Sequence, residues 1–212
     1  MHLPDGLLPP GLAIAGYAVS GGTLWYTLRR IRQERDPTEN IPKASLLTAA
    51  FFITSLLHIP VPPASIHLVL NGLMGIVLGT YAFPAVVIGL FFQAVMFGHG
   101  GISSLGVNAA MMGIPALLAS AVFQLLKPQA QRFAFGINAL SFTVGAGTLL
   151  LSAAIFVTLA ITAIPADVDA GLEQRAIMIA LTGYAIQAGI EGVFTSMIVA
   201  FLTRVKPELM NS

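Results

Sequence analysis

Residues 136–164 read GINALSFTVGAGTLLLSAAIFVTLAITAI, a run in which no side chain carries a charge. A helix needs roughly 20 apolar residues to cross a hydrocarbon layer about 30 Å thick. A helix is expected here because an isolated open strand would leave its backbone groups unpaired in lipid. This stretch therefore predicts a membrane-spanning helix.

Seven stretches meet or nearly meet the same requirement, and the second to fourth are the shortest. The one hydrophilic connection, at about 29–43, is too short to form a domain of its own. We therefore predict an all-α, polytopic integral membrane protein with a single domain over residues 1–212. Its seven helices are expected near 10–28, 44–58, 67–82, 84–98, 107–126, 136–164 and 177–203.

The composition agrees with this class of protein. The chain is 56% hydrophobic and only 9% charged, whereas about a quarter of the residues of a soluble globular domain carry a charge. A net charge of +1 gives no indication of a nucleic-acid partner. The chain has no cysteine, which excludes disulfides and thiolate metal sites. Histidine, carboxylate, amide and terminal nitrogen remain as possible metal ligands.

The positions of the basic residues predict the orientation in the membrane. Short loops rich in Lys and Arg face the cytoplasm, and with seven spans nearly all of these residues fall on one side. Only Arg175 falls on the other side, so the N-terminus is expected outside and the C-terminus inside. His58, His67 and His99 then lie at the external ends of helices, on the side of His2. The basic residues of the predicted inner side are Arg29, Arg30, Arg32, Arg35, Lys43, Lys127, Arg132, Arg204 and Lys206.

The segment at residues 1–9 begins Met1-His2-Leu3-Pro4-Asp5-Gly6 and favours a metal site. With the start methionine retained and deformylated, its amine, the backbone nitrogen of His2 and the His2 Nδ1 can bind one ion in fused chelate rings. Such a planar set of nitrogens suits Ni(II) or Cu(II), and a fourth ligand must come from elsewhere. The segment lacks the basic start and the cleavage site of a secretory signal, so we expect it in the mature protein. The alternative is a histidine at a solvated terminus.

His67 is the candidate for the fourth ligand. A metal-binding imidazole usually has its second nitrogen held by a hydrogen bond, and Ser65 or Asn71 could supply one. The alternative is an ordinary histidine at the membrane interface. His58 is a weaker candidate because it directly precedes Ile59-Pro60 and could simply cap its helix.

A run of glycines after residue 97 interrupts the apolar pattern, in Phe97-Gly98-His99-Gly100-Gly101. Non-helical backbone at membrane depth is tolerated only where protein buries it or where it lines a polar cavity. We expect His99 and Asn108 to support the metal site from this loop and from the start of the next helix. The alternative is a tight external turn.

Glu191 lies in the middle of the last predicted helix. An ionisable group at that depth is costly and usually functional. The alternative is a protonated side chain that holds two helices together by hydrogen bonding.

The chain contains none of the sequence motifs of three enzyme classes. It lacks the G-x-x-x-x-G-K-[ST] phosphate loop, the H-E-x-x-H metalloprotease pair and the nucleophile elbow. We therefore do not expect an enzyme, and this chain is not expected to hydrolyse ATP itself.

These residues resemble those of the CbiM/NikM family, the substrate-binding (S) components of energy-coupling-factor (ECF) transporters for cobalt and nickel. The resemblance covers nearly the whole chain. It implies a seven-helix S component whose first helix delivers the N-terminus into the protein interior. There the Met1 amine, the His2 backbone and ring nitrogens and the His67 ring would hold the ion. The matching stretches are Met1-His2-Leu3-Pro4-Asp5-Gly6, Ser65-Ile66-His67, His99-Gly100-Gly101, Leu105-Gly106-Val107-Asn108 and Ile190-Glu191-Gly192.

The resemblance also implies partners and a location. Family members work in the cytoplasmic (inner) membrane with a transmembrane coupling (T) protein and two ATPase (A) subunits, often with a small accessory membrane protein. Close helix contact needs small side chains, so the inner end of the second helix is our candidate for the partner contact. Its small residues are Ala44, Ser45, Thr48 and Ala49.

Nickel is the expected cargo, and cobalt is the alternative. Cobalt members of the family often begin M-H-I-M-E-G and carry Ser-His-Pro before the third helix. This chain has Pro4-Asp5 and Ser65-Ile66-His67-Leu68 at these places. No organic cofactor is expected. A stand-alone secondary permease or channel is the competing function, although such a protein would carry polar residues across the full membrane thickness.

Overall fold

The computed structural model describes residues 2–57, 59–61, 64–163 and 170–210. These residues form seven α-helices, two 3-10 turns and one antiparallel hairpin of three-residue strands. The helices are α1 Pro10–Ile31, α2 Ile41–Thr54, α3 Asn71–Leu78, α4 Ala82–Phe97, α5 Leu105–Ala130, α6 Gly136–Ala163 and α7 Ala170–Val205. The strands are β1 Ile59–Val61 and β2 Ala64–Ile66, and the 3-10 turns are η1 Gly79–Tyr81 and η2 Pro207–Met210.

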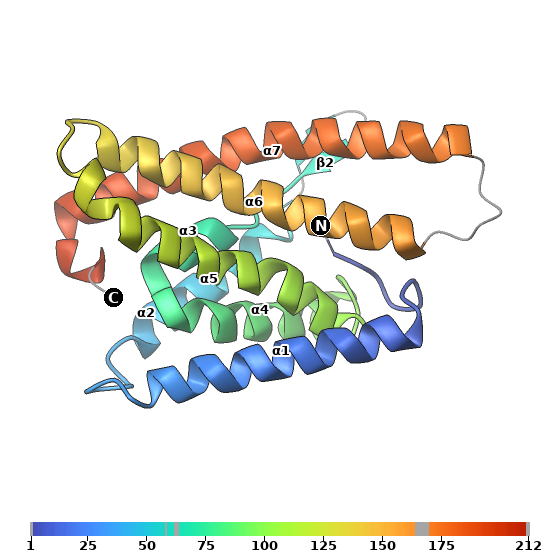
Figure 1. The fold of residues 1–212 in the computed structure, drawn as a ribbon, viewed down its shortest axis with the longest axis horizontal. Helices are drawn as coiled ribbons and strands as arrows, with labels where there is room; N and C mark the ends of the chain where they lie inside the picture. The colour runs from blue at the N-terminus through green and yellow to red at the C-terminus, as the bar shows by residue number, and fades with distance from the viewer. Residues whose placement is uncertain (1, 58, 62–63, 164–169, 211–212) are drawn as a thin grey trace.

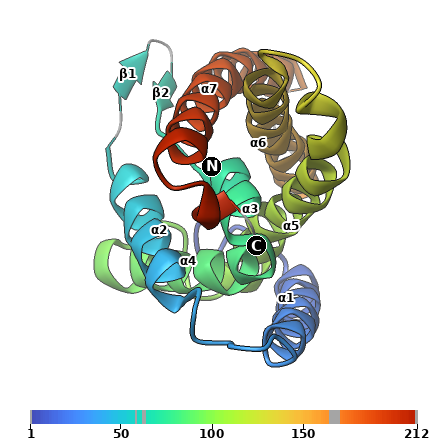
Figure 2. The same ribbon diagram turned by 90° about the vertical axis from the view of Figure 1, so that its left-hand side faces the viewer.

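The long helices run along the longest axis of the molecule (Figure 1). Seen end on, α3 lies in the middle of the bundle and α1 lies at its outer edge (Figure 2). Helix α5 packs against α1, α3, α4 and α6, while α6 pairs with α7 and α2 pairs with α4. All eight residues of α3 are buried, so this short helix forms the centre of the apolar core.

Local sequence accounts for the ends of α1. Its first residue is Pro10, and proline is tolerated in the first turn of a helix because the N–H it lacks would have no helical partner there. Arg29 and Arg30 lie in its last turn, where positive charge interacts favourably with the helix dipole.

The predicted helices at 44–58 and 67–82 are wrong in their bounds. Helix α2 ends at Thr54 and the hairpin follows it. Helix α3 has only 8 residues and is therefore about 12 Å long. It begins after Leu70, which has a positive φ of 56°, and it ends at Gly79, which has a φ of 59°. Residues 67–70 are thus non-helical backbone, and a later part of the chain satisfies their polar groups, as described below.

Four described helical stretches are long and apolar enough to cross a membrane. They are Asn71–Phe97, which combines α3, η1 and α4, and then Leu105–Ala130, Gly136–Thr162 and Ile179–Val205. Helix α2 is apolar but shorter. The prediction of seven spans is not confirmed by this finding, and the predicted orientation stays a prediction.

The surface of the protein is apolar, like its core. Large hydrophobic side chains such as Trp25, Leu46, Leu125 and Phe135 are more than 60% exposed. Exposed apolar side chains are this numerous where a protein surface contacts a membrane or a partner. This surface therefore agrees with a protein surrounded by lipid.

Candidate metal centre

Three histidines from distant parts of the sequence meet at one place in the structure. His2 comes from the N-terminal segment, His67 from the chain between β2 and α3, and His99 from the connection between α4 and α5. One nitrogen of each ring can be chosen so that all three nitrogens lie within 4.8 Å of one another. The rings of His2 and His99 are 4.3 Å apart between centroids, and each is 6.1 Å from the ring of His67. Imidazole nitrogen is a good ligand for nickel, copper and zinc, so this cluster can bind a transition-metal ion.

Asn108 and Ser104 hold the N-terminal segment at this place. The backbone N–H of Leu3 donates to Asn108 Oδ1 at 2.9 Å, and Asn108 Nδ2 donates back to the Leu3 carbonyl at 3.0 Å. Ser104 Oγ donates to the same carbonyl at 2.6 Å. The Leu3 side chain is completely buried. Asn108 therefore fixes the residue that follows His2, and its support of a bound metal ion stays a prediction.

Asp5 fastens the same segment to the glycine-rich connection. Its carboxylate accepts the backbone N–H of Ser103 at 2.8 Å, the Ser103 hydroxyl at 2.6 Å and the N–H of Ile102 at 3.2 Å. The hydrogen bonds from Ser103 lower the pKa of Asp5 from its ordinary value. A Cβ at Gly101 would collide with this carboxylate. A side chain at position 101 would therefore displace the Asp5 carboxylate.

Gln93 determines which nitrogen of His2 is available to a metal ion. Gln93 is fully buried in α4, and its Oε1 lies 3.0 Å from His2 Nε2. With the Gln93 amide oriented so that Oε1 accepts, the ring Nε2 carries the hydrogen and Nδ1 keeps its lone pair. Nδ1 is buried and has no hydrogen-bond partner among the described residues. Fixing one ring nitrogen so that the other can bind an ion is the usual arrangement in metal sites.

The His2 ring is held in its neutral form. Burial lowers the pKa of His2 well below its ordinary value of 6.5, and the neighbouring rings of His99 and His67 lower it further. A histidine must be neutral to bind a metal ion. His2 is therefore ready to act as a ligand near neutral pH.

Helix α7 holds the backbone around His67, which is itself buried. Gln187 Nε2 donates to the His67 carbonyl at 2.6 Å. The Glu191 carboxylate accepts the N–H of Val69 at 3.1 Å and also the N–H of Leu70. The sequence left two roles open for Glu191, a functional group at mid-membrane depth or a protonated side chain that links two helices. In the structure its carboxylate accepts backbone N–H groups next to the histidine cluster.

The structure does not place every predicted residue at the cluster. Asn71 donates to Ser152 Oγ at 2.9 Å and to the Met112 carbonyl at 3.4 Å. Its side chain therefore joins α3 to α5 and α6 rather than holding the His67 ring. Met1 and His58 lie outside the described residues, and so does the side chain of Ser65.

Four residues that contribute to the site were not predicted from the sequence, namely Asp5, Gln93, Ser104 and Gln187. Gln93 gave a usable signal, because it is a polar amide inside an otherwise apolar predicted helix. Like Glu191, it is a polar group at a depth where such groups are costly and usually functional. The contacts of Asp5 and Ser104 depend on the path of the glycine-rich connection, which the sequence pattern does not specify.

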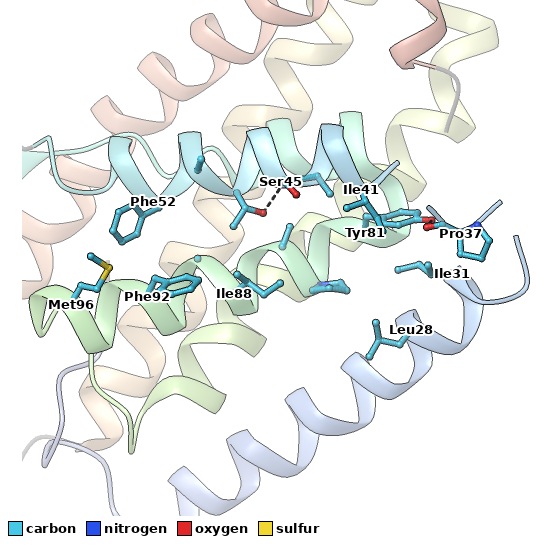
Figure 3. A pocket seen from close by; sticks show the side chains of 16 residues that line it. Leu28, Ile31, Pro37, Ile41, Ser45, Phe52, Tyr81, Ile88, Phe92 and Met96 are labelled. Atoms are coloured by element: carbon cyan, nitrogen blue, oxygen red, sulfur yellow. Dashed lines mark hydrogen bonds between the residues drawn. The ribbon is translucent and has the colours of Figure 1, made fainter. Parts of the chain in front are cut away.

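The predicted partner contact lines a separate apolar cavity of about 550 Å³ between α2, α4 and the end of α1. Ser45 of α2 faces it from one side, and Ile88, Phe92 and Met96 of α4 face it from the other (Figure 3). Thr48 of α2 also lines it. Ala44 and Ala49 line it too. His2, His67 and His99 are not among the residues that line this cavity.

Comparison with known proteins places these observations in a family. The CbiM family model, described as "Cobalt uptake substrate-specific transmembrane region", matches residues 2–209. A Haemophilus influenzae protein named "Putative metal transport protein" is 38% identical over 156 residues, which cover 72% of this chain and 73% of that protein. The "Cobalt transport protein CbiM" of Geobacter sulfurreducens is 28% identical over 99% of this chain. The "Fused nickel transport protein NikMN" of Rhodobacter capsulatus is 29% identical over 59% of it.

The last two relatives are longer proteins, since the matched parts cover only 61% and 37% of them. A solved structure titled as that of a transition metal transporter has the same fold. It superimposes with a TM-score of 0.77 over 97% of this chain and 93% of that chain, at 22% sequence identity.

Proposed function

The chain belongs to the CbiM family of cobalt and nickel transport components, and we propose that within it the chain is the metal-binding subunit of an ATP-driven ECF importer for nickel. The observation that carries this proposal is the cluster of His2, His67 and His99, with the His2 Nδ1 buried and without a partner among the described residues. A buried nitrogen lone pair without a donor is costly unless something binds it. A transition-metal ion is the ligand that this set of nitrogens fits.

The proposed ligands are His2 Nδ1, the His2 backbone nitrogen, the His67 ring and the amine of Met1. His99 lies close enough to approach the same ion or to guide it into the site. A planar set of nitrogens stabilises Ni(II), whereas Co(II) and Zn(II) prefer other geometries. This preference of geometry supports nickel over cobalt. Pro4-Asp5 and Leu68 support it too, because cobalt members of the family often carry other residues at these places. Cobalt is the alternative cargo.

Partner proteins would supply the energy for transport, since the sequence contains no phosphate-binding loop. We propose a transmembrane coupling protein, two ATPase subunits and sometimes a small accessory membrane protein. The coupling protein would dock on the cavity between α2 and α4, whose small residues Ala44, Ser45 and Ala49 allow close helix approach. The protein would lie in the cytoplasmic membrane with its N-terminus outside.

Nickel binding and nickel uptake test the two parts of this proposal separately. Purified protein is expected to bind nickel, and His2→Ala and His67→Ala should each abolish tight binding. One extra residue before Met1 should impair binding while leaving every side chain in place. In vesicles, uptake should require the ATPase subunits. Uptake by this chain alone would show a secondary permease instead, and unchanged binding in His2→Ala would exclude the proposed site.

A further inference from the structure

The backbone between β2 and α3 depends on partners from elsewhere in the chain. Residues 67–70 belong to neither a helix nor a strand, and Leu70 has a positive φ of 56°. A non-glycine residue in this conformation is sterically strained and persists only where its surroundings enforce it. Val69 and Leu70 are almost completely buried, so their N–H groups need protein acceptors.

Two side chains on one face of α7 supply these partners. Gln187 and Glu191 are four residues apart and therefore neighbours on the helix surface. Gln187 donates to the carbonyl of His67, and Glu191 accepts the two N–H groups at positions 69 and 70. Both side chains are buried, with exposed fractions of 2% and 0%. Three hydrogen bonds, at positions 67, 69 and 70, thus attach the His67 segment to α7.

We propose that Gln187 and Glu191 are positioning residues that set the place of the His67 ring against His2, so that α7 determines the geometry of the metal site. This inference rests on the proposed function. It assigns Glu191 a role distinct from that of a ligand, since both of its oxygens are occupied by backbone N–H groups. A shift of α7 along or about its axis would move the His67 ring with it and change the distance between the two histidines.

Replacing Glu191 with Gln removes part of this attachment at constant size. An amide has one acceptor oxygen, and its NH₂ group would face a backbone N–H, so one of the two N–H groups loses its partner. The backbone at Leu70 is then no longer held in its positive φ. Loss of a group that orients a metal-binding histidine typically weakens metal affinity about 10- to 100-fold, and we expect a loss of this size. Gln187→Met should have a similar but smaller effect, because it removes one bond.

The experiment compares full-length protein in detergent by nickel titration calorimetry and by the visible absorption spectrum of bound nickel. Thr195→Val is the matched control. Thr195 is also buried on α7, one turn beyond Glu191, and its Oγ1 has no partner among the described residues. The control should bind nickel like the native protein. In Glu191→Gln and Gln187→Met the spectrum should shift toward that of His67→Ala, because the ring has moved away from the ion.

A role in folding alone would lower the thermal unfolding temperature without changing the spectrum or the affinity of the folded protein, and that result would overturn the inference. If Glu191→Gln does not fold, Gln187→Met decides the question by the same criterion. A native protein that binds neither nickel nor cobalt would instead refute the proposed function.

Discussion

Replacing Gln93 with Leu removes the group that selects the metal-binding form of His2. In the structure the Gln93 side chain is fully buried and its Oε1 lies 3.0 Å from His2 Nε2. Leucine has a similar volume but no acceptor. The hydrogen of the ring is then free to move to Nδ1, and the nitrogen that should face the ion becomes a donor.

The magnitude follows from two contributions. A buried N–H left without an acceptor costs about 1–3 kcal/mol. In Gln93→Leu this cost falls on the metal-free protein as well as on the metal-bound protein, so much of it cancels from the free energy of binding. The part that appears in binding is the loss of the correct tautomer and of the ring orientation. Loss of such support to a metal ligand weakens affinity about 10- to 100-fold, which corresponds to about 1.4–2.7 kcal/mol at 1.4 kcal/mol for each factor of ten.

Competition for nickel with a chelator of known affinity measures this change on purified protein. Gln93→Glu is the control, because a carboxylate keeps an acceptor facing Nε2 and should keep the affinity within a few-fold of the native value. Thermal unfolding of both variants without metal checks the fold. If Gln93→Leu bound nickel within twofold of the native protein, the reasoning about the tautomer of His2 would be refuted.

Three further predictions concern other parts of the molecule. Gly101→Ala should weaken nickel binding about tenfold, because the new Cβ displaces the Asp5 carboxylate that fastens the N-terminal segment; unchanged binding in a calorimetric titration would contradict this. Burial lowers the pKa of His2 in the folded protein, so below about pH 6.5 the unfolded chain binds more protons than the folded chain. The free energy of unfolding of the metal-free protein should therefore fall between pH 7 and 5, and denaturant titrations should show a smaller fall in His2→Gln. Ser45→Leu should fill the cavity beside α2 and abolish uptake into vesicles containing the partner subunits, while nickel binding stays native; normal uptake would remove this cavity as the docking site.

The sequence predicted the family, which the match over residues 2–209 confirms, and a described helix overlaps each of the seven predicted ranges. It failed at residues 67–70, where Leu68, Val69 and Leu70 are as apolar as a helix that crosses a membrane. The partner that allows non-helical backbone there is Glu191, more than 100 residues further along the chain. A hydropathy profile depends only on residues that are neighbours in the sequence, so it cannot detect such a contact.

The candidate site was predictable in its residue types but not in its geometry. The positions of the basic residues placed four histidines on one predicted side, and the structure brings His2, His67 and His99 together. The bonds of Asp5 to Ser103 and of Asn108 to Leu3 hold His2 beside His99. These are individual side-chain contacts across nearly 100 residues, and no periodic pattern encodes them. Gln93 differs, because a buried amide in an apolar helix is visible in the sequence.

X-ray absorption at the nickel edge of the metal-loaded protein tests the central claim most directly, because it reports the atoms that surround the ion. The account predicts a shell of nitrogen ligands with scattering from at least two imidazole rings, and the loss of one ring in His67→Ala. A shell of oxygen ligands that is the same in the native protein and in His67→Ala would contradict it.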